Sequence, residues 1–265
     1  MSSAPGNLVV SRGQVVGSTA KPSVSVVVPT YNERENILQL VPQLAAAFRE
    51  YAYEIVVVDD DSPDRTGEAV TMLMQAYPSL RLVTKPSREG IGAALRVGYR
   101  QARGDIIVSC DADLAFDVED LVRLVEAVTK GDDLVVGSRH MEGARYEAGT
   151  WRVRCKRSVS RLGNAIVRVV FGMPVHDVSA NCRAIRQTVW RQIQTRENTN
   201  ALLLEMILRC HHGGFRVREL PVTFRDRRYG TSKLRLPIEV AKFLLAMVRY
   251  RWYYLWNRPH WRRVS

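Results

Sequence analysis

The sequence has few of the features that mark disulfide-rich or membrane-spanning proteins. It contains only four cysteines among 265 residues, and no two of them stand in a CxxC arrangement. This scarcity argues against a disulfide framework or a zinc site, and it favours reduced thiols in a reducing compartment. No window reaches the roughly 18 uninterrupted apolar residues that a membrane-spanning helix needs. The N-terminal segment also lacks a basic start followed by an apolar stretch, so we expect a mobile tail there and no signal peptide.

Internal repeats and low-complexity tracts are missing as well, and 46% of the residues are hydrophobic, as in an ordinary globular protein. The charge, by contrast, is unevenly distributed. Residues 1–137 carry 13 Lys and Arg against 19 Asp and Glu, a net charge of −6, whereas residues 138–265 carry 26 against 8, a net charge of +18. We expect the first half to hold cations and the second half to hold phosphates of a nucleotide, a lipid or a nucleic acid.

The first half alternates short β-branched runs with segments of helical periodicity. This order predicts an α/β fold with a mostly parallel sheet and helices on both faces. The expected strands are residues 24–28, 53–59, 80–84, 105–110 and 133–138, and the expected helices are residues 35–48, 64–77, 91–102 and 118–129.

The second half is less regular. Its pattern predicts a basic helix over residues 151–172, a helix over 202–210, an extended or hairpin element over 215–224 and a mobile loop over 225–237. We therefore divide the chain into a flexible tail (1–22), one large domain (23–236) and a C-terminal amphipathic helix (237–265).

Polar clusters follow three of the apolar strands. They are PTYNE at 29–33, DDDSPD at 59–64 and DAD at 111–113. In a parallel sheet the carboxyl ends of the strands share one edge, where ligands bind. A single cluster is as readily a helix cap, and Asp64 is a candidate for that role. Three clusters at one edge point instead to a binding site.

Asp111 and Asp113 stand one residue apart, so their carboxylates repel each other and lose hydration if they are even partly buried. A divalent cation is the simplest compensation. Two hard oxygen ligands with open positions suit Mg²⁺ or Mn²⁺, completed by water and by phosphate oxygens of a substrate. We therefore expect weak metal binding without substrate.

Five segments carry a resemblance to a known family. SVVVPTYNERENI, EIVVVDDDSPDRT, GDIIVSCDADL, GSR and GTSKL, in this order, resemble family 2 glycosyltransferases of the GT-A fold, and more narrowly dolichol-phosphate (polyprenol-phosphate) mannose synthases. DDDSPD together with GTSKL is more specific than DAD, which many sugar-nucleotide enzymes share. The resemblance covers residues 23 to 236. It implies metal-dependent, inverting transfer of a hexose, with mannose from GDP-mannose favoured, to a polyprenyl or dolichyl phosphate. A UDP-glucose-dependent glucosyltransferase is the alternative within the class.

The resemblance also implies roles for single residues. The residues that it implies for nucleotide binding are Pro29, Tyr31, Glu33, Val58, Asp60, Arg88, Asp111 and Ala112. Those that it implies for metal binding are Asp111 and Asp113. The implied catalytic residues are Asp113, Arg139, Arg227 and Lys233, the last two on a loop that closes over the phosphates. The acceptor phosphate is assigned to Arg139, Arg154, Arg157 and Ser158. For this role the pair Arg154 and Ser158 has the better spacing, i and i+4, and Arg157 is the alternative.

Two positions depart from the family pattern. Ala115 stands where the family often has a glutamine that helps to bind the metal, so a water or another side chain must replace it. SANCR follows Asp177 where SGF is usual, which weakens any inference about the transferred sugar.

The proposed chemistry suits these residue types. The transition state of glycosyl transfer is oxocarbenium-like, and a metal ion with basic side chains stabilises the leaving diphosphate. A phosphate monoester has a second pKa of about 6, so as an acceptor it needs no general base, only positioning by arginines. Some residues have structural alternatives: Arg139 as a surface charge, and Arg154 and Arg157 as a solvated helix face. For Glu205 the structural interpretation, a buried carboxylate paired with an arginine, is favoured over a pocket residue. We assign no histidine a catalytic role.

The C-terminal segment combines apolar, aromatic and basic residues. At helical spacing it carries Ile238, Ala241, Leu245, Val248 and Trp252. This composition favours a helix at a bilayer interface, with a helix packed on the core or in a dimer as the alternative. Because the acceptor is a long isoprenoid, the enzyme must also act at a membrane. We expect peripheral attachment on the cytoplasmic face, directly or through a membrane-anchoring partner.

A basic module that binds nucleic acid or membranes without catalysis is the alternative from a different class. It leaves the three acidic clusters unexplained, because they would repel nucleic acid. We therefore expect no nucleic-acid partner.

Overall fold

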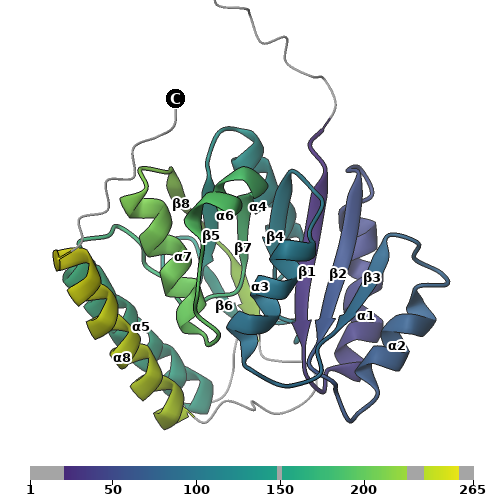
Figure 1. Ribbon diagram of the computed structural model, residues 1–265, viewed down its shortest axis with the longest axis horizontal. Coiled ribbons are helices and arrows are strands. Elements are labelled where there is room, and N and C mark those ends of the chain that lie inside the picture. The colour runs from purple at the N-terminus through teal and green to yellow at the C-terminus, as the bar shows by residue number, and fades with distance from the viewer. Residues whose placement is uncertain (1–20, 148–150, 226–235, 257–265) are drawn as a thin grey trace, which may run out of the picture.

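The computed structural model describes residues 21–147, 151–225 and 236–256 (Figure 1). Its centre is a seven-stranded sheet with the strand order β3-β2-β1-β4-β7-β5-β8. These strands are β1 (Val24–Thr30), β2 (Tyr53–Asp59), β3 (Leu80–Thr84), β4 (Ile106–Ser109), β5 (Leu134–Ser138), β7 (Arg183–Arg186) and β8 (Val217–Pro221). Neighbouring strands are parallel, except that β7 is antiparallel to both β4 and β5. The predicted α/β fold with a mostly parallel sheet is confirmed.

Helices cover both faces of the sheet. One face packs against α1 (Arg34–Ala47), α2 (Thr66–Leu73) and α4 (Val118–Thr129), and the other against α3 (Ile91–Gln101), α6 (Gln187–Ile193) and α7 (Ala201–His212). Two further helices, α5 (Trp151–Phe171) and α8 (Leu236–Trp256), lie side by side beyond α7 (Figure 1). A small second sheet pairs β6 (Arg145–Glu147) with β9 (Thr223–Arg225) in parallel.

The central strand β1 shows why the sheet lies between two layers. Val24, Val26 and Val28 belong to the hydrophobic cluster with α1 and α4, whereas Val27 belongs to the cluster with α3 and α7. Each of these side chains is at most 1% exposed, and burying a valine contributes about 1.5–3 kcal/mol. Packing from both sides thus fixes β1 and, with it, the polar residues that follow its carboxyl end.

Two strands and one helix, β6, β7 and α6, were not expected from the sequence. β7 reads RAIR, and its Arg183 is fully buried, with the guanidinium donating hydrogen bonds to the carbonyls of Ala180 and Leu203. A four-residue strand with a charged residue at each end lacks the apolar run that marks a buried strand. The hairpin alternative for 215–224 is wrong, because β8 and β9 belong to different sheets. Most of the loop expected over 225–237 lies outside the described residues, as does nearly all of the expected tail.

The C-terminal helix α8 has two apolar faces. Ala246, Met247 and Tyr250 are buried in the core cluster that includes α7, so this side packs on the body of the protein, as the alternative to a membrane helix predicted. Of the face expected from the sequence, Leu245, Val248 and Trp252 are 64% to 70% exposed. None of the described helices is long and apolar enough to cross a membrane.

Candidate active site

The strand ends predicted to meet do form one cavity. Thr30 at the end of β1 lies beside Asp59 at the end of β2, and β4 lies along the other side of β1. A cavity of about 220 Å³ opens there. Its lining includes eight of the predicted site residues, namely Pro29, Tyr31, Glu33, Asp60, Arg88, Asp111, Ala112 and Asp113. Val58 does not line it, because its side chain is fully buried between the sheet and the α3 layer. We call this space the acidic cavity.

The turns beside the cavity are held by their own polar side chains. Asp59 accepts hydrogen bonds from the hydroxyls of Thr30 and Ser62, at 2.9 and 2.6 Å. Asp64 accepts one from the backbone N–H of Thr66, the first residue of α2. Asp59 and Asp64 therefore hold the turn, although the N-cap position of α2 is Arg65, and Asp60 is the member of the cluster that faces the cavity.

Asp60 is paired with a lysine that the sequence analysis missed. Lys85 Nζ lies 3.1 Å from Asp60 Oδ1, and both side chains are less than 10% exposed. Burial raises the pKa of Asp60, against the opposing effect of the Lys85 ammonium group. Lys85 directly follows β3, so the strand-end pattern extends to a fourth strand and could have identified it. Arg88, three residues further on, stacks over the ring of Tyr31 with its guanidinium carbon 4.1 Å from the ring centroid.

The two aspartates after β4 are fixed by different neighbours. Asp113 Oδ1 accepts a hydrogen bond from the backbone N–H of Ala115, in a turn where Leu114 has a positive φ of 59°. Asp111 Oδ1 accepts one from Asn181 Nδ2 at 3.0 Å. Asp113 is 6% exposed and Asp111 is half-buried. Hydrogen bonds from described residues thus help to fix both carboxylates.

Asn181 belongs to a buried chain of hydrogen bonds that ends at Asp111. The Ser109 hydroxyl donates to Asn181 Oδ1 at 2.8 Å, and the Tyr99 hydroxyl lies 2.7 Å from Ser109 Oγ. Tyr99, Ser109 and Asn181 are each at most 2% exposed. Asn181 lies in the SANCR segment, which the sequence marked only as a departure from the family pattern. The structure shows that it orients Asp111.

The donor set suits a hard divalent cation. Mg²⁺ and Mn²⁺ are bound in proteins by one or two carboxylates, with water and substrate phosphate oxygens in the other positions. Asp111 and Asp113 supply such a pair, while the side chain of Ala115 is buried and offers no oxygen. The described residues contain no group of three or more His, Cys, Asp or Glu side chains arranged to hold a metal. A substrate that supplies phosphate oxygens would complete the coordination of a cation held by Asp111 and Asp113.

Arg139, predicted to contact phosphate, forms an ion pair at the end of β5. Its Nε and Nη2 donate to the two carboxylate oxygens of Asp177 at 2.7 and 3.0 Å, and Nη2 also donates to Ser179 Oγ. Burial would raise the pKa of Asp177, but the Arg139 guanidinium holds it at about 2. Glu219 accepts hydrogen bonds from the backbone N–H groups of His176 and Asp177. The ion pair with Asp177 gives Arg139 a structural role, and a contact between Arg139 and a phosphate stays a prediction.

The other predicted residues lie on α5 or outside the described residues. Arg157 stacks over the ring of Tyr146, 4.4 Å from its centroid, and Ser158 is exposed. The side chain of Arg154 is outside the described residues, as are Arg227 and Lys233. Their roles remain predictions.

Helix α8 contributes a residue to the acidic cavity that was not predicted. Lys242 lines it together with Thr199 and Asn200, which precede α7. In the sequence, Lys242 was visible only as an interruption of an apolar run.

Two groups with open interpretations have structural roles. Glu205 is fully buried, pairs with Arg209 at 2.8 Å and accepts the backbone N–H groups of Arg196 and Glu197. The structural alternative for Glu205 is therefore confirmed. Three cysteines, Cys110, Cys182 and Cys210, are buried and free, and burial raises the pKa of each thiol.

The comparison with known families agrees with this geometry. Residues 25–194 match the family described as glycosyl transferase family 2. The chain belongs to glycosyltransferase family 2, and the resemblance and the class of enzyme predicted from the sequence are confirmed.

Relatives and solved structures can then be named. The chain is 34% identical over 214 residues to a dolichol-phosphate mannosyltransferase of Pyrococcus furiosus, covering 80% of this chain and 59% of that protein. It is 35% identical over 216 residues to a polyprenol monophosphomannose synthase of Mycolicibacterium smegmatis, covering 79% of this chain and 80% of that one. This chain thus matches less than two thirds of the Pyrococcus furiosus protein.

Two solved structures share the fold at low sequence identity. A mannosyltransferase from Pyrobaculum calidifontis, in complex with GDP-Man and Mn²⁺, superposes with a TM-score of 0.61 at 22% identity, covering 88% of this chain and 64% of that one. Glucosyl-3-phosphoglycerate synthase from Mycobacterium tuberculosis, in complex with Mn²⁺, UDP and phosphoglyceric acid, gives a TM-score of 0.66 at 20% identity, covering 87% and 78%.

Proposed function

We propose that this protein transfers mannose from GDP-mannose to a polyprenyl or dolichyl phosphate, using Mg²⁺ or Mn²⁺ and inverting the anomeric carbon. The observation that carries this proposal is the acidic cavity, where side chains from the ends of β1, β2 and β4 meet Arg88 and Lys242. The names of the relatives in Pyrococcus furiosus and Mycolicibacterium smegmatis support mannose and a polyprenyl phosphate as the two halves of the reaction.

The cavity suits the donor half of the reaction. Tyr31, stacked under Arg88, and the buried Asp60–Lys85 pair form a polar and aromatic wall on the β1–β3 side. We assign nucleoside binding to this wall. Asp111 and Asp113 would hold the metal, which supplies positive charge to the departing diphosphate. Arg88 and Lys242 face the same space, and we assign them to the diphosphate as well.

The acceptor phosphate reaches the sugar as a nucleophile that is already ionised, since its second pKa is about 6. The protein therefore has to position it and exclude water, and needs no side chain to remove a proton. Arg139 lies beside Asp177, and Arg157 on α5 lies above Tyr146. We assign the acceptor to this basic region. A single in-line attack from there inverts the anomeric carbon.

Membrane attachment is part of the proposal, because the acceptor lipid resides in a bilayer. The exposed residues Leu245, Val248 and Trp252 of α8 form an apolar surface, and α5 beside it exposes Leu162 and Val169. Apolar helix faces with aromatic and basic residues bind in the interfacial region of membranes. We propose peripheral attachment through this surface on the cytoplasmic side, directly or with a membrane-anchoring partner.

The test is sugar transfer from a panel of GDP- and UDP-sugars to a short polyprenyl phosphate. We expect transfer from GDP-mannose, its loss in the presence of a metal chelator, and its loss in Asp111→Ala and Asp113→Ala. Transfer from UDP-glucose alone would replace the donor assignment with the glucosyltransferase alternative. Transfer that survives both substitutions and the chelator would contradict the mechanism.

A further inference from the structure

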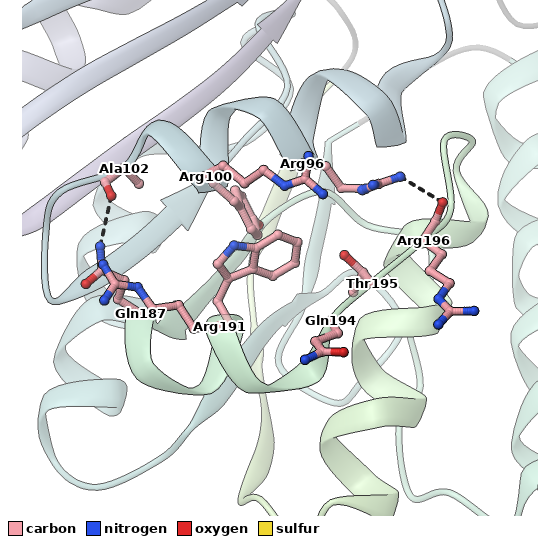
Figure 2. Close-up of a pocket in the computed structure, with 10 residues that line it drawn as sticks. Arg96, Arg100, Ala102, Gln187, Arg191, Gln194, Thr195 and Arg196 are labelled. Carbon is pink, nitrogen blue, oxygen red and sulfur yellow. Dashed lines mark hydrogen bonds between the residues drawn. The ribbon is translucent and has the colours of Figure 1, made fainter.

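A second cavity, larger than the acidic one, lies between α3 and α6 and is lined by arginines. Its volume is about 530 Å³, within the range of small-molecule sites. Four arginines surround it, Arg96 and Arg100 from α3, Arg191 from α6, and Arg196 from the segment that follows α6 (Figure 2). Its lining contains no carboxylate. We call it the arginine cavity.

The four guanidinium groups are not neutralised by the protein. Within the described part of the chain, none of them forms an ion pair with an aspartate or glutamate, in contrast to Arg81, Arg139 and Arg209. Arginines that line one cavity with no carboxylate beside them favour an anion there. Arginine is also the side chain best suited to bind a phosphate through paired N–H donors.

Arg96 adds an unsatisfied donor to this wall. Its Nη1 donates to the carbonyl of Arg196 at 2.8 Å (Figure 2). It also donates to Asn198 Oδ1 at 2.7 Å, and the two bonds fix the side chain against the segment after α6. Its Nε is buried and has no hydrogen-bond partner among the described residues. Buried donors are nearly always paired in proteins, so an acceptor from a bound molecule would satisfy this donor.

Other lining residues fix α3 and α6 to each other. Trp190 and Tyr99 pack edge to face with ring centroids 4.6 Å apart, and both are less than 10% exposed. Gln187 Nε2 donates to the carbonyl of Ala102, which ties α6 to the end of α3 (Figure 2). Arg96, Arg100 and Arg191 therefore lie on two helices that are fixed to each other. Such a preformed arrangement binds a ligand without a large cost of ordering.

We propose that the arginine cavity binds an organic phosphate, at a site separate from the acidic cavity. The ligand is either a soluble phosphorylated compound or the headgroup of an anionic phospholipid, since both present the same phosphate oxygens. The site does not depend on the proposed transfer reaction. It is joined to the acidic cavity by residues 196–200, because Arg196 lines the one while Thr199 and Asn200 line the other.

The test uses two probes and a pair of variants with equal charge. The cavity variant is Arg100→Glu with Arg191→Glu, two exposed residues whose side chains make no hydrogen bond within the described part of the chain. The control is Arg49→Glu with Arg216→Glu, which reverses two exposed charges outside both cavities. Pyrophosphate binding is measured by calorimetry with a chelator present, so that no metal reaches Asp111 and Asp113. Flotation with phosphatidylglycerol-containing vesicles, compared with pure phosphatidylcholine, tests the lipid headgroup.

We expect saturable binding of at least one probe, with the dissociation constant raised tenfold or more in the cavity variant and within twofold of wild type in the control. If the cavity variant loses pyrophosphate binding, the ligand type is a soluble phosphate. If it loses only the binding to vesicles, the ligand is a lipid headgroup. If wild type binds neither probe, or if the two variants affect binding alike, the assignment of this site is overturned.

Discussion

Asn181 orients Asp111, and replacing it with alanine should weaken metal binding by about 10- to 100-fold. The amide donates to Asp111 Oδ1 at 3.0 Å, in a chain whose other members, Ser109 and Tyr99, are buried. A hydrogen bond to a charged group contributes about 1.5–3 kcal/mol, and about 1.4 kcal/mol corresponds to a factor of ten in affinity. Loss of a residue that orients a metal ligand has effects of the same size.

The measurement is a titration with Mn²⁺ in the presence of GDP, followed by the paramagnetic signal of the free ion. Asn164→Ala is the matched control. Asn164 is buried to a similar degree but accepts a hydrogen bond from the backbone N–H of Val178, with no bond to Asp111 or Asp113. The control should bind Mn²⁺ as wild type does. If Asn181→Ala also binds Mn²⁺ within twofold of wild type, while Asp111→Ala does not bind it, the orienting role of Asn181 is refuted.

Substitutions at four further positions have expected outcomes. Lys242→Ala should raise the dissociation constant for GDP by about tenfold, because the proposed diphosphate site loses a cation that lines the cavity. Lys242→Arg should keep most of the affinity, and unchanged calorimetric titrations would exclude Lys242 from the donor site. Gly92→Ala would place a Cβ 2.4 Å from the carbonyl oxygen of Thr199, so urea titration should show a loss of about 1–3 kcal/mol in the free energy of unfolding. Gly163→Ala, where nothing lies within 4 Å of the added Cβ, should be neutral or stabilising, and an equal loss in both would contradict the packing argument. Burial lowers the pKa of His140 to about 4, so the native state disfavours its protonation. The free energy of unfolding should therefore fall by up to about 3 kcal/mol as the pH drops from 6.5 to 4, and His140→Gln should reduce that slope in urea titrations at each pH. If the free energy of unfolding of His140→Gln falls with pH as steeply as that of wild type, His140 is not its cause.

The local pattern of the sequence accounts for most of the sheet and its helices. β2, β3 and α4 begin and end at the predicted residues, because each is a continuous apolar run or a clear amphipathic period. β7 could not be found in this way. It is short, it carries a buried arginine, and it is held by pairing with β4 and β5, which lie far from it in the sequence.

The residues of the candidate site also fall into those that the sequence pattern placed and those that it did not. The strand-end rule brought Asp60, Asp111 and Asp113 to one cavity, since the order of parallel strands is enough to place their carboxyl ends together. Asn181 and Lys242 come from the loop before β7 and from α8, so their positions follow from tertiary packing that no local pattern shows. Arg139 was expected at a phosphate, but its ion pair joins residues 38 positions apart and was equally invisible in the sequence.

We propose that Asp111 and Asp113 together hold a metal at the diphosphate of the sugar nucleotide. Crystals grown with GDP and Mn²⁺, measured at a wavelength where manganese scatters anomalously, test it most directly. We expect one strong anomalous peak within coordination distance of both carboxylates and of the diphosphate oxygens. A nucleotide bound away from Asp60, or a manganese peak that contacts neither Asp111 nor Asp113, would contradict it.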